Sequence, residues 1–195
     1  MKGLPNLLTA LRLALALVVF AALAGAADAQ TPAPFRTALP AAAFAAYVVA
    51  AVTDFFDGWL ARRWNATSVW GAILDPIADK VLTCAAILGL MAIRPGAAIA
   101  VPGALILFRE FAVSALREVI APSGLKLPVT PLAKWKTTVQ LVALGAEMAI
   151  VAWPGLGAGV ALAADALLWT AAAITLLTGG QYLAQAAKAL AEAER

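Results

Sequence analysis

The chain has no histidine, a single cysteine and few charged residues. Of its 195 residues only 13% are charged, and 64% are hydrophobic. The one cysteine, Cys84, excludes an internal disulfide. Histidine and cysteine are the usual ligands of zinc, so a zinc site is not expected. A sequence this apolar is typical of a membrane protein rather than of a soluble domain of the same length.

Apolar runs of membrane-spanning length recur along the chain. They predict an all-α, polytopic membrane protein, a six-helix transmembrane bundle that forms one domain over residues 1–195. The runs cover residues 7–27, 40–60, 69–93, 97–116, 139–153 and 160–177. Connections are short except around residues 28–39 and 118–133. The first run also fits a secretory signal peptide with a cleavage site near residues 24–29.

The positive charges are unevenly placed. With the N-terminus in the cytosol, twelve lysine and arginine residues fall on the cytosolic side, and only Arg36 and Arg94 face outward. This asymmetry fits the positive-inside rule. It predicts an inner (plasma) membrane protein whose two termini and polar centre face the cytosol. No nucleic-acid partner is expected.

Four carboxylates interrupt the apolar sequence between residues 54 and 79. Asp54 and Asp57 are three apart, and Asp75 and Asp79 are four apart, so each pair lies on one helix face. If two antiparallel helices meet at residues 62–68, Asp54 comes level with Asp79 and Asp57 with Asp75. At about 1.5 Å per residue, all four lie roughly 13–19 Å along the helices from the turn.

Four like charges at that depth repel one another strongly in a medium of low dielectric. Protonation would relieve the repulsion, and so would two divalent cations. Oxygen ligands favour Mg²⁺ or Mn²⁺. The alternative is a buried polar cluster that only ties helices together. Because carboxylates are costly inside a membrane, we favour a functional site.

The carboxylates belong to a longer pattern, D-x2-D-G-x2-A-R-x8-G-x3-D-x3-D, and every fixed position of it is filled. This pattern resembles the signature of the CDP-alcohol phosphatidyltransferases, membrane enzymes that make phospholipids. The resemblance implies that two metal ions are held by Asp54, Asp57, Asp75 and Asp79, and that Asp79 is also the catalytic base. It implies that CDP-diacylglycerol binds at Asp57, Gly58, Ala61, Arg62 and Gly71.

Gly58 and Ala61 have two readings. Glycine inside a helix costs about 1 kcal/mol relative to alanine, so its presence needs a reason. Small residues three apart allow close packing of a neighbouring helix. The resemblance instead implies that they make room for the cytidine diphosphate, and that Arg62 meets its phosphates. The planar guanidinium binds phosphate oxygens in pairs.

Three flanking segments are similar to the branch of the family that uses sn-glycerol 3-phosphate, the phosphatidylglycerophosphate synthases. They read P-N-L-L-T-A-L-R (5–12), R-E-F-A-V-S-A-L-R-E (109–118) and A-K-W-K-T-T-V-Q (133–140), with Ala133 where glycine is usual. Signal-peptide cleavage would remove the first. By composition alone, the segments are read as a capped helix end and as charges anchored at the membrane surface. The resemblance implies that CDP-diacylglycerol also meets Asn6 and Thr9, and that the acceptor phosphate binds Arg109, Arg117, Lys134 and Lys136.

The reaction implied by the resemblance converts CDP-diacylglycerol and glycerol 3-phosphate into phosphatidylglycerophosphate and CMP, in a homodimer within the lipid bilayer. Acceptors of related enzymes, namely inositol phosphate, serine and phosphatidylglycerol, stay open. A small cation-coupled transporter would use the same carboxylates but should carry polar groups toward both faces. Here the polar residues gather in the cytosolic half, which favours the enzyme. Glu147 and Asp165 receive no role.

Overall fold

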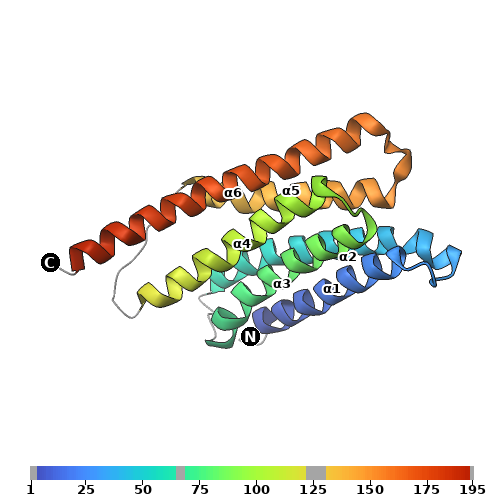
Figure 1. The fold of residues 1–195 in the computed structure, drawn as a ribbon. Helices are drawn as coiled ribbons and strands as arrows, with labels where there is room; N and C mark the ends of the chain where they lie inside the picture. The colour runs from blue at the N-terminus through green and yellow to red at the C-terminus, as the bar shows by residue number, and fades with distance from the viewer. Residues whose placement is uncertain (1–3, 65–68, 122–130, 194–195) are drawn as a thin grey trace.

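Six long helices make up almost all of the described chain in the computed structural model, which covers residues 4–64, 69–121 and 131–193 (Figure 1). They are α1 (Leu4–Ala27), α2 (Ala33–Trp64), α3 (Val69–Ile93), α4 (Ala97–Ile120), α5 (Pro131–Ala152) and α6 (Ala158–Ala193). A short 3₁₀ turn, η2 (Pro154–Leu156), precedes α6. These ranges contain no strand. The predicted all-α architecture of six helices is confirmed.

Several helices extend beyond the apolar runs from which they were predicted. α2 begins at Ala33 rather than near residue 40, so the expected loop over residues 33–39 is helical. Pro34 fits there because the first turn of a helix needs no N–H from it. α6 continues to Ala193, well past residue 177. Its last turns consist largely of alanine, leucine, glutamine, lysine and glutamate, which favour helix without being apolar.

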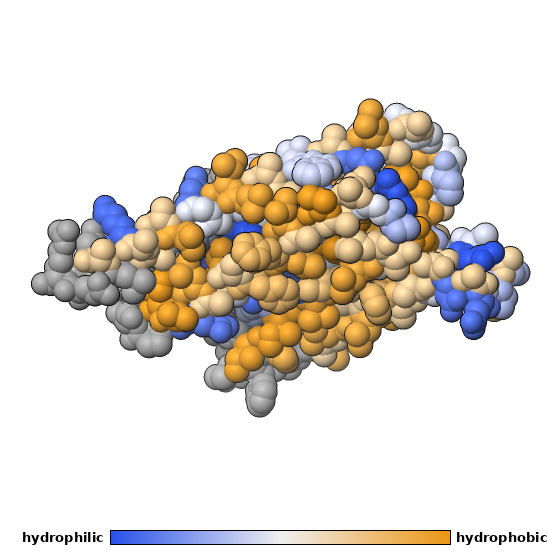
Figure 2. All heavy atoms as spheres, in the orientation of Figure 1, coloured by the Kyte–Doolittle hydropathy of each residue, from blue (hydrophilic) through white to orange (hydrophobic). Residues whose placement is uncertain are grey.

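The chain is an integral membrane protein. Within the described residues, five helices are long and apolar enough to cross a membrane: Leu7–Ala27, Ala33–Asp54, Ile73–Ile93, Ala97–Ile120 and Ala158–Lys188. α5 is not in this set, because Lys136, Gln140 and Glu147 lower its hydropathy. Figure 2 shows apolar side chains over the length of the helices and polar ones concentrated toward the ends.

The helices run alternately up and down. α1, α3 and α5 start at one end of the bundle, where α2, α4 and α6 finish (Figure 1). We call this the terminal end. The connections at 28–32, 94–96 and 153–157 lie at the other end. α1 packs against α2 and α3, α4 packs against α6, and α5 lies between α2 and α6.

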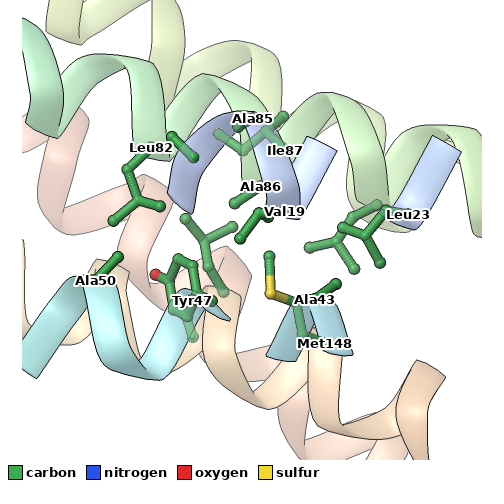
Figure 3. Packing of buried hydrophobic residues seen from close by; sticks show 14 of the residues in the cluster. Val19, Leu23, Ala43, Tyr47, Ala50, Leu82, Ala85, Ala86, Ile87 and Met148 are labelled. Atoms are coloured by element: carbon green, nitrogen blue, oxygen red, sulfur yellow. The ribbon is translucent and has the colours of Figure 1, made fainter. Parts of the chain in front are cut away.

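The core lies where α1, α2, α3 and α5 meet. Val19 of α1, Tyr47 of α2, Ile87 of α3 and Met148 of α5 pack there, among many alanines (Figure 3). Small residues allow membrane helices to approach closely, which matters because lipid supplies no hydrophobic driving force between them. A Cβ at Gly89 of α3 would lie only 2.7 Å from Leu23 Cδ1, so α1 and α3 require glycine here.

Candidate active site

Arg12 of α1 lies between two of the four predicted carboxylates. Its Nη1 is 2.8 Å from Asp54 Oδ1 of α2 and 3.0 Å from Asp79 Oδ1 of α3. The Arg12 side chain is 1% exposed, whereas those of Asp54 and Asp79 are 39% and 56% exposed. Arg12 is therefore a buried partner of the carboxylates and not a snorkelling surface charge. Since one nitrogen reaches both, Asp54 and Asp79 lie level, as the antiparallel arrangement predicted.

Thr9 lies one turn before Arg12 on the same face of α1. Its hydroxyl donates to Asp75 Oδ1 at 2.5 Å, and the residue is buried. Asp75 lies four residues before Asp79 on α3, so it shares a helix face with it and the three carboxylates lie close together. Three carboxylates and one guanidinium leave two net negative charges. We call Thr9, Arg12, Asp54, Asp75 and Asp79 the carboxylate cluster.

Other residues assigned from the sequence fall outside the side chains that the structure describes. They are Asn6, Asp57, Gly58, Ala61, Arg62 and Lys134. Their assigned roles stay predictions. Gly71 is described and buried at the start of α3.

The donor chemistry of the carboxylate cluster suits a hard divalent cation. Its ligands would be oxygens, and its described groups carry two net negative charges, which one such ion balances. In the described part of the chain, no three acidic or thiol side chains are grouped tightly enough to hold a metal by themselves. The fourth acidic residue of the pattern, Asp57, lies outside that part.

A second group of charges is assembled from α4, α5 and α6. Arg109 and Lys136 are both buried, and both donate to the same oxygen, Glu110 Oε1; the Arg109 Nη1 distance is 3.4 Å. Glu110 thus pairs with Lys136 of the neighbouring helix α5. Arg117 lies two turns after Arg109 on α4. We call Arg109, Glu110, Arg117 and Lys136 the cation cluster.

Sequence reasoning missed the contribution of α6 to this cluster. Arg109 Nη2 donates to Thr178 Oγ1 at 3.2 Å, and Arg117 Nη2 donates to the Tyr182 hydroxyl at 2.8 Å. Thr178 and Tyr182 are both buried. They are four residues apart and share a helix face, the one sequence signal that could have found them. Because Thr178 and Tyr182 lie far from Arg109 along the chain, their contacts with α4 could not be inferred from the sequence.

The two clusters lie next to each other. Gln140 Nε2 of α5 donates to Thr83 Oγ1 of α3 at 3.3 Å, and both residues are buried. Asp79 precedes Thr83 by four residues, and Lys136 precedes Gln140 by four. α3 and α5 run in the same direction (Figure 1). Asp79 and Lys136 therefore each lie about one helical turn, roughly 6 Å, from the Thr83–Gln140 hydrogen bond, and both lie on its terminal-end side.

An apolar groove of about 640 Å³ lies between α2 and α5. It is lined by residues that include Tyr47 and Val52 of α2 and Leu141 of α5. Val52 lies two residues before Asp54 on α2, so the groove reaches the level of the carboxylate cluster and extends from there along the apolar length of the bundle. The Tyr47 hydroxyl donates a hydrogen bond to the carbonyl oxygen of Leu141 at 3.1 Å, so it is not available to a ligand in the groove. This leaves a surface suited to hydrocarbon.

A third charged group lies at the opposite end of the bundle. Arg94, just after α3, donates to Glu147 of α5 and, at 3.1 Å, to Asp165 of α6. Glu147 is fully buried. These contacts give the buried carboxylate of Glu147 a cationic partner. The group joins the end of α3 to α5 and α6, far from the two clusters.

Comparisons with known proteins agree with this arrangement. The sequence model of the CDP-alcohol phosphatidyltransferases matches residues 2–177. A CDP-diacylglycerol–glycerol-3-phosphate 3-phosphatidyltransferase of Cereibacter sphaeroides is 38% identical over 176 residues, with 72% of this chain and 79% of that protein covered. A protein of the same name from Escherichia coli K12 is 43% identical over 150 residues, covering 75% and 79%. One from Rickettsia bellii is 40% identical over 139 residues, covering 70% and 74%.

Proposed function

The chain belongs to the CDP-alcohol phosphatidyltransferase family, and we propose that it transfers the phosphatidyl group of CDP-diacylglycerol to sn-glycerol 3-phosphate, with release of CMP. The relatives at about 40% identity bear the name of this activity. One observation supports glycerol 3-phosphate as the acceptor. The cation cluster adjoins the carboxylate cluster across the Thr83–Gln140 hydrogen bond.

The charge of the cation cluster matches the acceptor. Arg109, Arg117 and Lys136 carry three positive charges, and Glu110 removes one. A phosphate monoester, whose second pKa is about 6, is close to a dianion at pH 7. Two net positive charges would balance it. Serine carries only a carboxylate beside its ammonium group, and phosphatidylglycerol only a singly charged phosphodiester. Neither would balance two net positive charges, and unbalanced buried cations are costly.

The lipid substrate fits the other side of the site. The groove between α2 and α5 offers an apolar path for an acyl chain, and its lining residue Val52 is nearly level with Asp54 on α2. The pyrophosphate would then lie at the carboxylate cluster. We assign its metal, two ions of Mg²⁺ or Mn²⁺, to Asp54, Asp57, Asp75 and Asp79, because the pyrophosphate would add its negative charge to that of the carboxylates. When bound, such ions offset the charge of the pyrophosphate and of the leaving CMP.

Asp79 is the candidate base. It is exposed enough to meet a substrate and is oriented by Arg12, which binds its Oδ1. Asp79 would accept the proton of the acceptor hydroxyl. That oxygen then bonds to the phosphorus bearing diacylglycerol, and the bond from this phosphorus to the bridging oxygen breaks. The electron pair leaves with CMP. Glycerol 3-phosphate, anchored on the cation cluster, would have its hydroxyl held near Asp79.

We also propose that the terminal end faces the cytosol and that the protein is a homodimer. Arg36 and Arg94 belong to the opposite end of the bundle, while the two functional clusters lie toward the terminal end. This distribution supports the orientation through the positive-inside rule. Labelling of cysteines placed at residues 29 and 191 in intact cells tests it. Light scattering of purified protein, with the detergent mass subtracted, tests the dimer.

Purified protein in detergent tests the reaction. CMP release from CDP-diacylglycerol is followed with Mg²⁺, with and without glycerol 3-phosphate, and after addition of EDTA. We expect release that requires both acceptor and metal, and that Mg²⁺ or Mn²⁺ in excess of EDTA restores. Release only with inositol phosphate, serine or phosphatidylglycerol would retain the family and refute the acceptor. Release that EDTA leaves unchanged would refute the metal assignment.

A further inference from the structure

Helix α6 closes the cation cluster with residues that follow the part of the chain matched by the family's sequence model. The match ends at residue 177, and Thr178, Gly179 and Tyr182 come directly after it. Each of the three lies against Arg109 or Arg117. The proposed function uses the two arginines, but leaves open what keeps them in place.

Tyr182 touches both guanidinium groups. Its ring centroid lies 4.8 Å from Arg117 Cζ and 5.7 Å from Arg109 Cζ. Its hydroxyl also accepts the 2.8 Å hydrogen bond from Arg117 Nη2. Both distances fall within the range in which a cation is attracted to an aromatic ring, about 6 Å. With 1% of its surface exposed, Tyr182 is fixed within the bundle.

Thr178 fixes Arg109 from the same helix. Its Oγ1 accepts from Arg109 Nη2 at 3.2 Å. The hydroxyl hydrogen of Thr178 is directed to carbonyl oxygens of α6, those of Ile174 at 3.0 Å and Thr175 at 2.9 Å. The lone pairs of the oxygen therefore point away from the helix backbone, toward Arg109.

Gly179 provides the space that Arg109 occupies. A Cβ at this position would lie 2.8 Å from Arg109 Cγ, well inside contact distance. At the next position, Gly180, a Cβ would meet nothing within 4 Å. The stem of Arg109 thus lies directly on the backbone of α6.

We propose that Tyr182 and Thr178 are positioning residues that hold Arg109 and Arg117 as a fixed pair, set to receive the phosphate of the acceptor. Two guanidinium groups repel each other, and the one carboxylate of the cation cluster, Glu110, is shared between Arg109 and Lys136. The tyrosine ring and the threonine hydroxyl offset that repulsion without neutralising either charge. The pair therefore keeps its positive charge for a phosphate monoester. This inference rests on the proposed function, because it concerns the acceptor of that reaction.

Substitution of Tyr182 gives a graded test. Tyr182→Phe keeps the ring and removes the hydroxyl, so we expect the KM for glycerol 3-phosphate to rise about fivefold, the usual effect of one lost hydrogen bond. Tyr182→Leu removes the ring as well, and we expect a rise of about thirtyfold. The KM for CDP-diacylglycerol and the kcat should change less than about twofold, because these variants affect binding of the acceptor alone.

Thr178 and a neighbour supply controls. Thr178→Ala should raise the KM for glycerol 3-phosphate, and Thr178→Ser, which retains the hydroxyl, should restore it. Leu183→Ala changes the adjacent residue, whose side chain is 62% exposed, and should leave all constants as they are. Equal KM values for glycerol 3-phosphate in Tyr182→Leu and the unaltered protein would overturn the proposal. So would a parallel loss for both substrates.

A binding measurement separates this inference from the proposed reaction. Inorganic phosphate should raise the thermal unfolding temperature of the unaltered protein in detergent, and Tyr182→Leu should need about tenfold more phosphate for the same shift. If the unaltered protein released CMP without any need for glycerol 3-phosphate, the reaction would be refuted while the phosphate result stood. If phosphate stabilised both proteins alike, the positioning role would be refuted whatever the reaction.

Discussion

Arg12 Nη1 lies 3.0 Å from Asp79 Oδ1, although 67 positions separate the two residues in the sequence. A buried guanidinium therefore engages the carboxylate that we propose as the base. The Arg12 guanidinium places a positive charge inside the carboxylate cluster. It holds Asp54 and Asp79 together in the folded chain, and with Asp75 the cluster keeps two net negative charges.

Replacement of Arg12 should weaken the fold. In Arg12→Gln, Asp54 and Asp79 lose their shared partner and repel each other. We expect the free energy of unfolding to fall by about 1–2 kcal/mol, a modest value because water reaches both carboxylates. Thermal unfolding in detergent measures it. Added Mg²⁺ should restore part of the loss if the cluster binds metal, and an unchanged unfolding temperature without Mg²⁺ would contradict the structural role.

Asp79→Asn should abolish turnover. The amide cannot accept the acceptor proton, and loss of a general base lowers rates about 10²- to 10⁴-fold. Binding of CDP-diacylglycerol should persist, because the other carboxylates remain. CMP release and lipid binding are measured on the same preparation. Asp28→Asn, at the opposite end of the bundle and exposed, is the matched control. Full activity in Asp79→Asn would rule out the assignment.

Gly179→Ala and Gly180→Ala form a matched pair on α6. Alanine improves helix propensity equally at both positions, by about 1 kcal/mol. Only at position 179 does the new methyl group collide with Arg109. We expect the KM for glycerol 3-phosphate to rise about tenfold in Gly179→Ala, equivalent to about 1.4 kcal/mol. It should stay constant in Gly180→Ala. Identical acceptor kinetics in the two variants would show that Arg109 takes no part in acceptor binding.

Arg94→Ala should reduce stability without changing the chemistry. Glu147 is fully buried, and removal of Arg94 leaves its charge without the cation. We expect a loss of about 2 kcal/mol, below the value for a fully buried pair because Arg94 is 28% exposed. Arg36→Ala, on the same end and exposed, should have little effect. A stable Arg94→Ala protein, or one folded but inactive, would contradict a purely structural role for this group.

The sequence predicted much of the candidate site because its chemistry is local. Asp54 and Asp79 are assigned by their spacing within a short pattern, and the antiparallel course of their two helices places them at one level. Arg109 and Arg117 share a face by helix periodicity alone. The predicted ends of α2 and α6 were wrong because hydropathy was used to locate them. A helix ends where its backbone hydrogen bonds end, and these continue beyond the apolar run.

Residues on distant helices were harder to assign. Arg12, Glu147 and Tyr182 each appear in the sequence as isolated polar residues in an apolar run. Each implies a partner, because a polar group inside a membrane is costly alone, but none identifies it. Arg12 pairs with Asp54 of α2 and Asp79 of α3. Glu147 pairs with Arg94, which follows α3, and Tyr182 contacts two arginines of α4. The partners depend on which helices adjoin, and many packings satisfy the same pattern of polarity.

The sequence by itself determined that this chain is a helical membrane protein with an acidic motif of the CDP-alcohol phosphatidyltransferases, since composition, periodicity and motif spacing act along the chain. The tertiary structure decided that Arg12 joins the acidic residues, that α6 completes the cation cluster, and that the two clusters adjoin. These facts arise from the packing of helices far apart in sequence. Such packing depends on glycines that leave room for a large side chain of another helix, as Gly89 does for Leu23 and Gly179 for Arg109, and on the pairing of buried charges across helices.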